Sequence, residues 1–174
     1  MMFVEDRTIL SPKTSAILCP ANGCGILSHG ILAEIAEIAG PKLSIESRKI
    51  ALINGKPREP GDYYITSSYK MSRRRVKSLF HAVIVKYPGD IAGLQSVSKS
   101  LRASLQEAVA KKIESIAIPC MAFETSLGLD KRSVARISFT IASEFKSSLI
   151  IKFIDTDKEY INEIENFLSR GLKK

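Results

Sequence analysis

The stretch LCPANGCGILSHGILAEIAEIAGP, residues 18–41, runs from a short apolar segment through a turn with three glycines into a segment of helical periodicity. Residues 16–18 are too few for a helix and are followed by Pro20, so they predict a buried strand. Apolar residues at 31, 35 and 38 predict one face of a helix, which Gly40 and Pro41 end. A glycine-rich turn between a strand and a helix can offer backbone N–H groups to an anion.

The rest of the sequence repeats this pattern of short apolar runs and longer amphipathic segments, with a mixed region at 43–62. Asp130 and Thr156 are predicted N-caps, the latter with Glu159 at capping-box spacing. The pattern predicts an α/β fold: a three-layer α/β/α sandwich with a mixed, largely parallel central sheet, formed by a single domain of residues 1–174. Further strands are predicted at 63–66, 79–85, 115–119 and 149–154, and further helices at 97–112, 130–145 and from 156 onward.

The composition is that of a globular protein, with 45% apolar and 25% charged residues. No run of about 18 apolar residues occurs, which excludes a transmembrane helix, and the acidic residues at 5 and 6 argue against a signal peptide. Three cysteines cannot all pair with one another, which favours a reducing compartment. We therefore expect a cytoplasmic protein without a membrane partner.

Cysteine and histidine side chains near the glycine-rich turn could indicate a metal site or a nucleophilic cysteine. Cys19, Cys24 and His29 are separated by four residues each, which matches no common zinc pattern, and only Cys120 is an obvious fourth ligand. A nucleophilic cysteine needs a neighbouring base, and no local sequence pairs a cysteine with His29 or His81. We expect no metal and no bound cofactor.

The crevice of an open α/β sheet lies beyond the carboxyl ends of its strands, which places the expected ligand site at the loops 19–30 and 120–130. Much of the net charge of +8 is clustered at the C-terminal residues 170–174 and in the loop 70–77. Basic side chains with nearby tyrosines suit a single-stranded nucleic acid, which this loop would hold at the rim of the crevice. The basic residues of the loop are Lys70, Arg73, Arg74, Arg75 and Lys77.

Taken together, these segments resemble the macro domain family. The family's first signature, VNAAN followed by glycines and a helix ending in AAGP, is similar to residues 18–22, Gly30 and residues 38–41. The family stretch GxxxITxGYxL is similar to residues 61–71, and its element GIKSIAFP is similar to residues 113–119. The order and spacing of the elements match from about residue 3 to residue 170.

The resemblance implies a crevice that binds ADP-ribose or a related nucleotide, with RNA or an ADP-ribosylated protein as further candidate partners. It implies that Asn22, the candidate catalytic residue, bonds the distal ribose, and that Asp6 bonds the adenine amino group. The phosphates would lie near Gly30 and Gly128, and Phe123 would stack on a base or ribose. The full set of implied ligand-binding residues is Asp6, Asn22, Gly23, Ser28, His29, Gly30, Ile31, Phe123, Thr125, Ser126 and Gly128.

The sequence departs from the family pattern at the positions that matter for function. Ser28 and His29 replace glycines, and Glu124 would repel a phosphate. Leu32 stands where several hydrolytic members carry an acid, which favours a binding module over an ADP-ribosyl hydrolase or an ADP-ribose-1''-phosphate phosphatase. Three interpretations stay open: an ADP-ribose binder, a nucleic-acid binder using the basic loop, and a degenerate member that acts through protein contacts.

Overall fold

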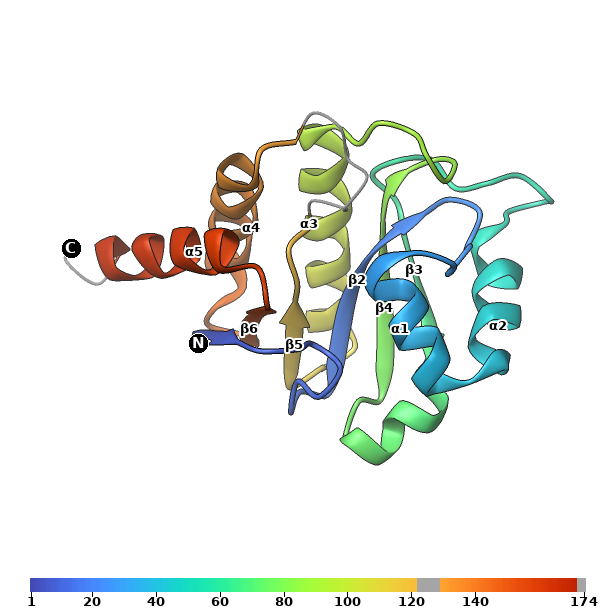
Figure 1. Ribbon diagram of the computed structural model, residues 1–174, viewed down its shortest axis with the longest axis horizontal. Helices are drawn as coiled ribbons and strands as arrows, with labels where there is room; N and C mark the ends of the chain where they lie inside the picture. Colours follow the sequence, from blue (N-terminus) through green and yellow to red (C-terminus); the bar gives the residue numbers. More distant parts are fainter. Residues whose placement is uncertain (122–128, 172–174) are drawn as a thin grey trace.

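The computed structural model describes residues 1–121 and 129–171 and contains a six-stranded sheet between two layers of helices (Figure 1). The strand order is β1-β6-β5-β2-β4-β3, and every neighbouring pair is parallel except β3 and β4. The predicted three-layer sandwich with a mixed, largely parallel sheet is therefore confirmed. The strands are β1 (Met2–Asp6), β2 (Ala16–Asn22), β3 (Tyr63–Ser67), β4 (Ser78–Val85), β5 (Ser115–Ile118) and β6 (Ile150–Asp155).

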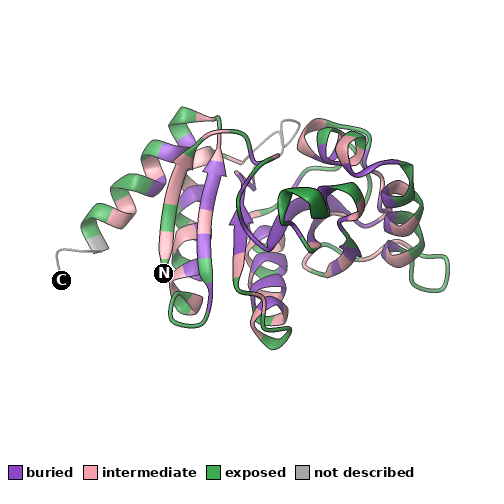
Figure 2. Ribbon diagram, turned by 90° about the horizontal axis from the view of Figure 1, so that it is seen from below, coloured by how far each residue is buried: buried purple, intermediate pink, exposed green. Residues whose placement is uncertain are grey.

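The helices divide between the two faces of the sheet. Helices α3 (Leu94–Ala110), α4 (Lys131–Phe145) and α5 (Lys158–Gly171) cover one face, and α1 (Gly30–Ala39) and α2 (Pro41–Ala51) cover the other. All seven residues of β2 are buried, as Figure 2 shows for the centre of the sheet, because both faces of a parallel strand are covered by helices. Of the helices in the described ranges, none is both long and apolar enough to cross a membrane.

The structure differs from the sequence-based expectation in four elements. Strand β1, helix α2 and the short 3₁₀ helix η1 (Tyr69–Arg74) were not expected. Gly40, at φ 93°, ends α1 and is directly followed by Pro41 as the first residue of α2, so one Gly-Pro pair ends one helix and begins the next. Thr156 does not cap the last helix: the Asp157 carboxylate accepts from the Tyr160 N–H at 3.1 Å instead.

His81 lies in the centre of β4 and is fully buried. Its ring stacks on Tyr64 at 4.4 Å between centroids, and its Nε2 lies 2.8 Å from the Thr66 hydroxyl. Its Nδ1 has no hydrogen-bond partner among the described residues. Burial lowers the pKa of His81 to about 3, so this histidine stays neutral and belongs to the core rather than to a catalytic pair.

Replacing His81 is expected to make the free energy of unfolding depend less on pH below about pH 6.5. The unfolded chain protonates His81 near pH 6.5 and the folded protein only near pH 3, so the free energy of unfolding falls as the pH drops through this window. The fall is up to about 1.4 kcal/mol per pH unit. Denaturant unfolding between pH 6.5 and 5 should show this slope in the parent and lose it in His81→Phe and His81→Gln. An identical slope in all three proteins would contradict the conclusion that His81 is neutral in the folded core.

Candidate functional site

A crevice opens where β2 and β5 separate. These strands pair only at Ala16–Ile116 and Ile17–Ala117, whereas β2 stays paired with β4 as far as Asn22. Pro20 and Pro119 lie beyond the last β2–β5 pair, and neither has an N–H to extend the ladder. The chain also reverses its winding direction here, since β4 lies on one side of β2 and β5 on the other. Such a switch point is where open α/β sheets bind ligands.

The cavity in this crevice has a volume of about 690 Å³ and lies at the carboxyl ends of the parallel strands. Its walls come from the segment after β1, from β2, from the start of α1, from the residues that follow β5, from the beginning of α4 and from the end of β6. The described residues that line it are Thr8, Ile9, Pro20, Gly30, Ile31, Glu34, Pro119, Cys120, Leu129, Lys131, Ile154, Asp155, Thr156 and Asp157.

In the part of the chain that the structure describes, the N-terminus of α1 opens into this cavity without a capping side chain. Its N-cap, His29, has extended backbone and makes no side-chain hydrogen bond to the first turn. By contrast, Asp130 accepts from the Ser133 N–H in α4, and Asp157 caps α5. The first turn of α1 therefore keeps N–H groups and the positive end of its dipole available to an anion at Gly30, whose φ is 54°.

Two of the three carboxylates that line the cavity, Asp155 and Asp157, bond to other residues of the cavity wall. Asp155 accepts from the N–H of Cys120 at 2.8 Å and of Asp157 at 2.9 Å, which fastens the end of β5 to the end of β6. Asp157 pairs with Lys131 at 2.6 Å. Partial burial alone would raise the pKa of Asp157, but Lys131 and the N–H of Tyr160 outweigh it and lower the pKa.

Glu34 is the third carboxylate, and it is exposed with no ion pair or hydrogen bond in the described part of the chain. Helical side chains lean toward the N-terminus of their helix, which brings the Glu34 carboxylate toward the open first turn of α1. A free carboxylate at this place competes with an anionic ligand for the same helix end. Sequence reasoning missed Glu34 because it looked for an acid only at Leu32, which is buried.

Asn22 lies at the end of β2, and its side chain is used within its own turn. Its Oδ1 accepts from the N–H groups of Cys24 at 3.2 Å and Ile26 at 3.1 Å, and its Nδ2 donates to the carbonyl of Ile26 at 2.8 Å. The residue is buried and is not among those that line the crevice. In this structure the Asn22 side chain therefore stabilises the turn that leads to α1.

Gly23 and Gly25 are required by close packing of the same turn. A Cβ on Gly23 would lie 2.1 Å from the carbonyl oxygen of Arg58, and one on Gly25 would lie 2.5 Å from that of Ser47. The Gly23 N–H donates to the carbonyl of Val85 at 3.0 Å, so it is already engaged within the chain.

The cysteines and the histidine of the turn point to separate partners. Cys19 is fully buried in the core beneath α1 and α2, and burial raises the pKa of its thiol. Cys24 Sγ contacts the carbonyl of Lys86, and His29 Nδ1 lies 2.8 Å from the Ser28 hydroxyl on the exposed surface. Within residues 1–121 and 129–171, no group of histidine, cysteine or carboxylate side chains could hold a metal ion.

The remaining predicted ligand contacts are placed as follows. Asp6 is exposed at the end of β1, opposite Asp155 in the β1–β6 pairing, and its neighbours Thr8 and Ile9 rather than Asp6 itself line the crevice. Gly30 and Ile31 line it as expected, whereas Ser28 and His29 do not. Phe123, Thr125, Ser126 and Gly128, together with Glu124, lie outside the described residues.

The basic loop does not lie at the rim of the crevice. It directly precedes β4, and the Lys77 N–H donates to the carbonyl of Ser15, just before β2. It is therefore at the amino ends of the parallel strands, as Figure 1 shows for η1, while the crevice is at their carboxyl ends. The expectation failed because the antiparallel strand β3 carries the chain back across the sheet before η1.

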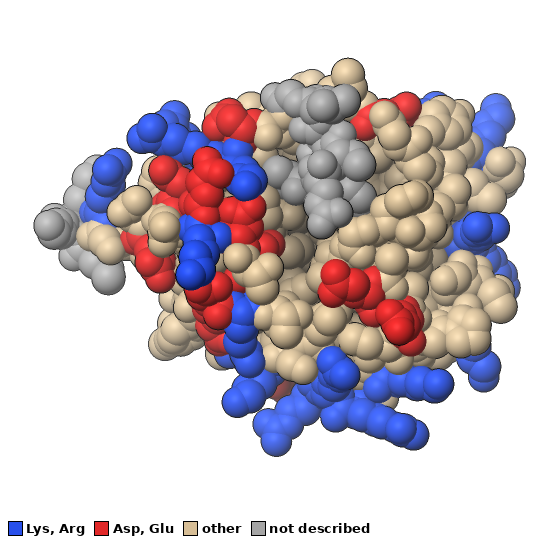
Figure 3. Space-filling view, viewed as in Figure 1, with Lys and Arg blue, Asp and Glu red and all other residues tan. Residues whose placement is uncertain are grey.

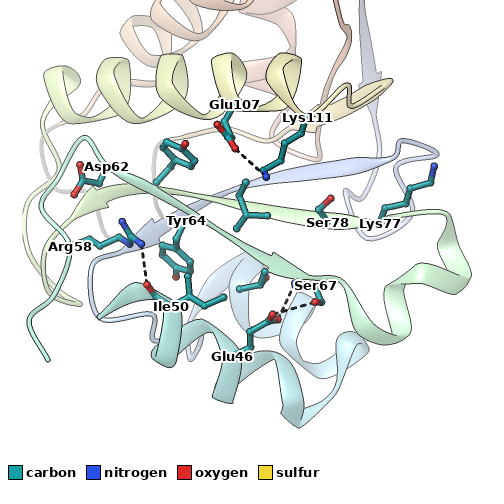
Figure 4. A pocket seen from close by; sticks show the side chains of 13 residues that line it. Glu46, Ile50, Arg58, Asp62, Tyr64, Ser67, Lys77, Ser78, Glu107 and Lys111 are labelled. Atoms are coloured by element: carbon teal, nitrogen blue, oxygen red, sulfur yellow. Dashed lines mark hydrogen bonds and ion pairs between the residues drawn. The ribbon is translucent and has the colours of Figure 1, made fainter. Parts of the chain in front are cut away.

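A second cavity, of about 640 Å³, runs along β3 between α2 and α3 (Figure 4). Several of its charged side chains have partners within the protein: Glu107 pairs with Lys111 at 3.2 Å, and Arg58 Nη2 donates to a carbonyl of α2 at 3.2 Å, whereas Arg58 Nε has no partner among the described residues. Glu46 accepts from the backbone N–H of Ser67 at 2.9 Å and so blocks part of the open edge of β3. We therefore assign the candidate site to the crevice between β2 and β5.

Two curated relatives match this chain over most of its length. Among curated relatives, an uncharacterized protein of Aquifex aeolicus is 25% identical over 167 residues, covering 95% of this chain and 96% of the relative. An uncharacterized protein of Sulfolobus acidocaldarius is 29% identical over 156 residues, covering 88% and 81%.

Solved structures with the same fold include macrodomains from two organisms. A mutant of the Oceanobacillus iheyensis macrodomain with ADPR has a TM-score of 0.82 at 21% identity, covering 99% of this chain and 93% of that one. The Oceanobacillus iheyensis macrodomain with ADP has a TM-score of 0.80 at 20% identity, with coverages of 99% and 90%. The Trypanosoma brucei macrodomain in complex with ADP has a TM-score of 0.75 at 20% identity, with coverages of 96% and 67%.

The sequence itself matches the family described as Macro domain over residues 19–138, which is more than half of the chain. This match begins at Cys19, in the strand that leads to the crevice, and ends within α4. The chain belongs to the macro domain family.

Proposed function

We propose that this protein binds ADP-ribose or another ADP-containing nucleotide in the crevice between β2 and β5. The observation that carries the proposal is the uncapped N-terminus of α1, which opens at Gly30 into a cavity of about 690 Å³ at the carboxyl ends of the strands. The macrodomains of Oceanobacillus iheyensis and Trypanosoma brucei that share this fold were solved with ADPR or ADP.

The shape of the crevice supports one orientation of the ligand. We place the diphosphate against the first turn of α1, where Gly30 and Ile31 offer backbone N–H groups without a capping side chain in the way. The other end of the crevice is lined by Thr8, Ile9 and Ile154, which provide the mostly apolar surface that a purine needs. Asp6, exposed beside this end, is then the acceptor for the adenine amino group.

The proposal is for binding without turnover. Leu32 is buried and apolar, so the helix carries no acid at the position that the resemblance associates with hydrolysis. The Asn22 amide is engaged in its own turn, and its role in this proposal is to hold the N-terminus of α1 in place for the ligand.

Titration calorimetry with ADP-ribose, ADP and AMP tests the proposal. We expect ADP-ribose and ADP to bind and AMP to bind at least tenfold more weakly, because AMP lacks the second phosphate that the helix end would hold. The absence of heat and of a thermal shift with ADP-ribose and ADP at millimolar concentration would rule the function out.

Glu34→Gln is expected to tighten ADP binding by about two- to fivefold, because it removes a competing negative charge from the open helix end. Calorimetry at low salt provides the measurement, and a gain in affinity cannot result from damage to the fold. Glu37→Gln is the matched control, since it changes the same charge one turn further along α1 on an exposed position outside the cavity lining. Equal effects of the two variants, or a loss of affinity in Glu34→Gln, would contradict the placement of the phosphates.

Asn22→Ala is expected to lower the free energy of unfolding by about 1–3 kcal/mol, because it leaves two N–H groups and a carbonyl of the turn without their partners. Denaturant unfolding measures this change, and nucleotide binding should weaken with it. Asn22→Asp keeps both acceptor contacts and should retain most of the stability. If Asn22→Ala weakened binding with no loss of stability, Asn22 would instead contact the ligand directly.

A further inference from the structure

Six basic side chains gather at the amino ends of the parallel strands, on the end of the molecule away from the crevice. Two segments bring them together: the Arg74 guanidinium donates to the carbonyl of Leu10 at 2.8 Å, and the Lys77 N–H donates to that of Ser15 at 2.7 Å. Figure 3 shows the resulting concentration of Lys and Arg along one edge of the protein. We call this the basic surface; its residues are Lys13, Lys70, Arg73, Arg74, Arg75 and Lys77, all exposed.

Among the described residues, no carboxylate forms an ion pair with the basic surface; Glu46 reaches the start of its second segment but accepts from the N–H and hydroxyl of Ser67. Residues 7–33 and 67–78, which carry it, contain no aspartate or glutamate. None of its six cations takes part in an ion pair with the described residues, although cations elsewhere, such as Lys131 and Lys152, do. Clustered like charges repel one another, so an anionic partner would relieve this repulsion when it binds.

The backbone of the basic surface adopts conformations that side-chain-bearing residues seldom use. Three residues of these two segments have positive φ without being glycine: Lys13 at 50°, Tyr69 at 47° and Arg75 at 70°. Such conformations carry a cost and persist where the surrounding structure holds them. Here they turn the chain so that consecutive cations of η1 and its end face solvent.

The chemistry of the surface favours phosphate groups over carboxylates or lipid. Three of the six cations are arginines, whose planar guanidinium matches phosphate oxygens in pairs. The exposed large apolar residues of the described chain all lie outside these two segments, so the surface lacks an anchor for a membrane or a peptide. Tyr64 is buried against His81, and Tyr69 is half-buried in the core, so neither offers a free ring on which a base could stack.

We propose that the basic surface binds nucleic acid through the phosphate backbone, without base stacking, at a site separate from the nucleotide crevice. Lys77 directly precedes the first β2–β4 pair, Ala16–Ser78, whereas Pro20, which lines the crevice, pairs with Ala82 further along β2. Five strand residues span about 13 Å, which leaves room for both ligands at once. This binding rests on the basic surface alone and does not depend on the function proposed for the crevice.

Fluorescence anisotropy with a labelled 20-base-pair DNA duplex, the same RNA duplex and each single strand tests the proposal between 50 and 200 mM salt. For the DNA duplex we expect log K to fall against log salt with a slope of about −3 to −5, since each neutralised phosphate contributes about −0.9. The triple variant Arg73→Gln, Arg75→Gln, Lys77→Gln should weaken binding at least tenfold at 50 mM salt and reduce the slope by 2 to 3 in magnitude, at about one per cation. Saturating ADP-ribose should leave the affinity unchanged.

The matched control removes the same charge outside the basic surface, through Arg136→Gln on α4, Lys146→Gln at the C-cap of α4 and Arg170→Gln on α5. It should change the affinity less than twofold, and both triple variants should keep the parent's unfolding midpoint. Arg73→Glu provides a single-site check and should weaken binding more than Arg73→Gln. The proposal is overturned by no binding at 50 mM salt, by equal losses in both triple variants, by displacement with ADP-ribose, or by equally tight binding of a polyglutamate of matched charge.

Discussion

The separation of β2 from β5 is the constraint on which the rest of this structure depends. Both strands are buried and parallel, so without an interruption they would pair along their full length. The ladder ends after Ile17–Ala117, and the prolines at 20 and 119 face the opening without an N–H to close it. A sheet that parts at its switch point must fill the opening with something other than a strand. Here the opening is bordered by a helix end, two loop segments and the carboxylate of Asp155.

The turn between β2 and α1 determines what that opening can bind. Asn22 satisfies three backbone groups of the turn, and Gly23 and Gly25 let it pack against the backbone at Arg58 and Ser47. These contacts fix where α1 begins, and its first N–H groups are left available because no described side chain caps them. In the described structure Cys19 packs in the core, Cys24 contacts the carbonyl of Lys86, and His29 contacts the Ser28 hydroxyl.

The sequence was sufficient to predict most of the fold but only part of the site. The strand at 16–18, the helix cap at Asp130 and the Gly40–Pro41 boundary follow from local rules and are found in the structure. Helix α2 was not predicted, because its apolar face is short and its first residue, Pro41, is also typical of the end of a helix. The acids at 155 and 157 follow a predicted strand at its carboxyl end, a signal that could have identified them. The place of the basic loop required the direction of β3, which no local pattern contains.

We infer that a nucleotide diphosphate binds at the open end of α1 in the crevice between β2 and β5. Amide chemical-shift mapping with ADP-ribose tests it most directly, because it reports on each N–H group separately. The predicted result is that the largest shifts fall at Gly30, Ile31 and Leu32, with further shifts at Ile9, Cys120 and Thr156. Shifts confined to the groove along β3, at residues 63–67, or to the basic surface would contradict the claim.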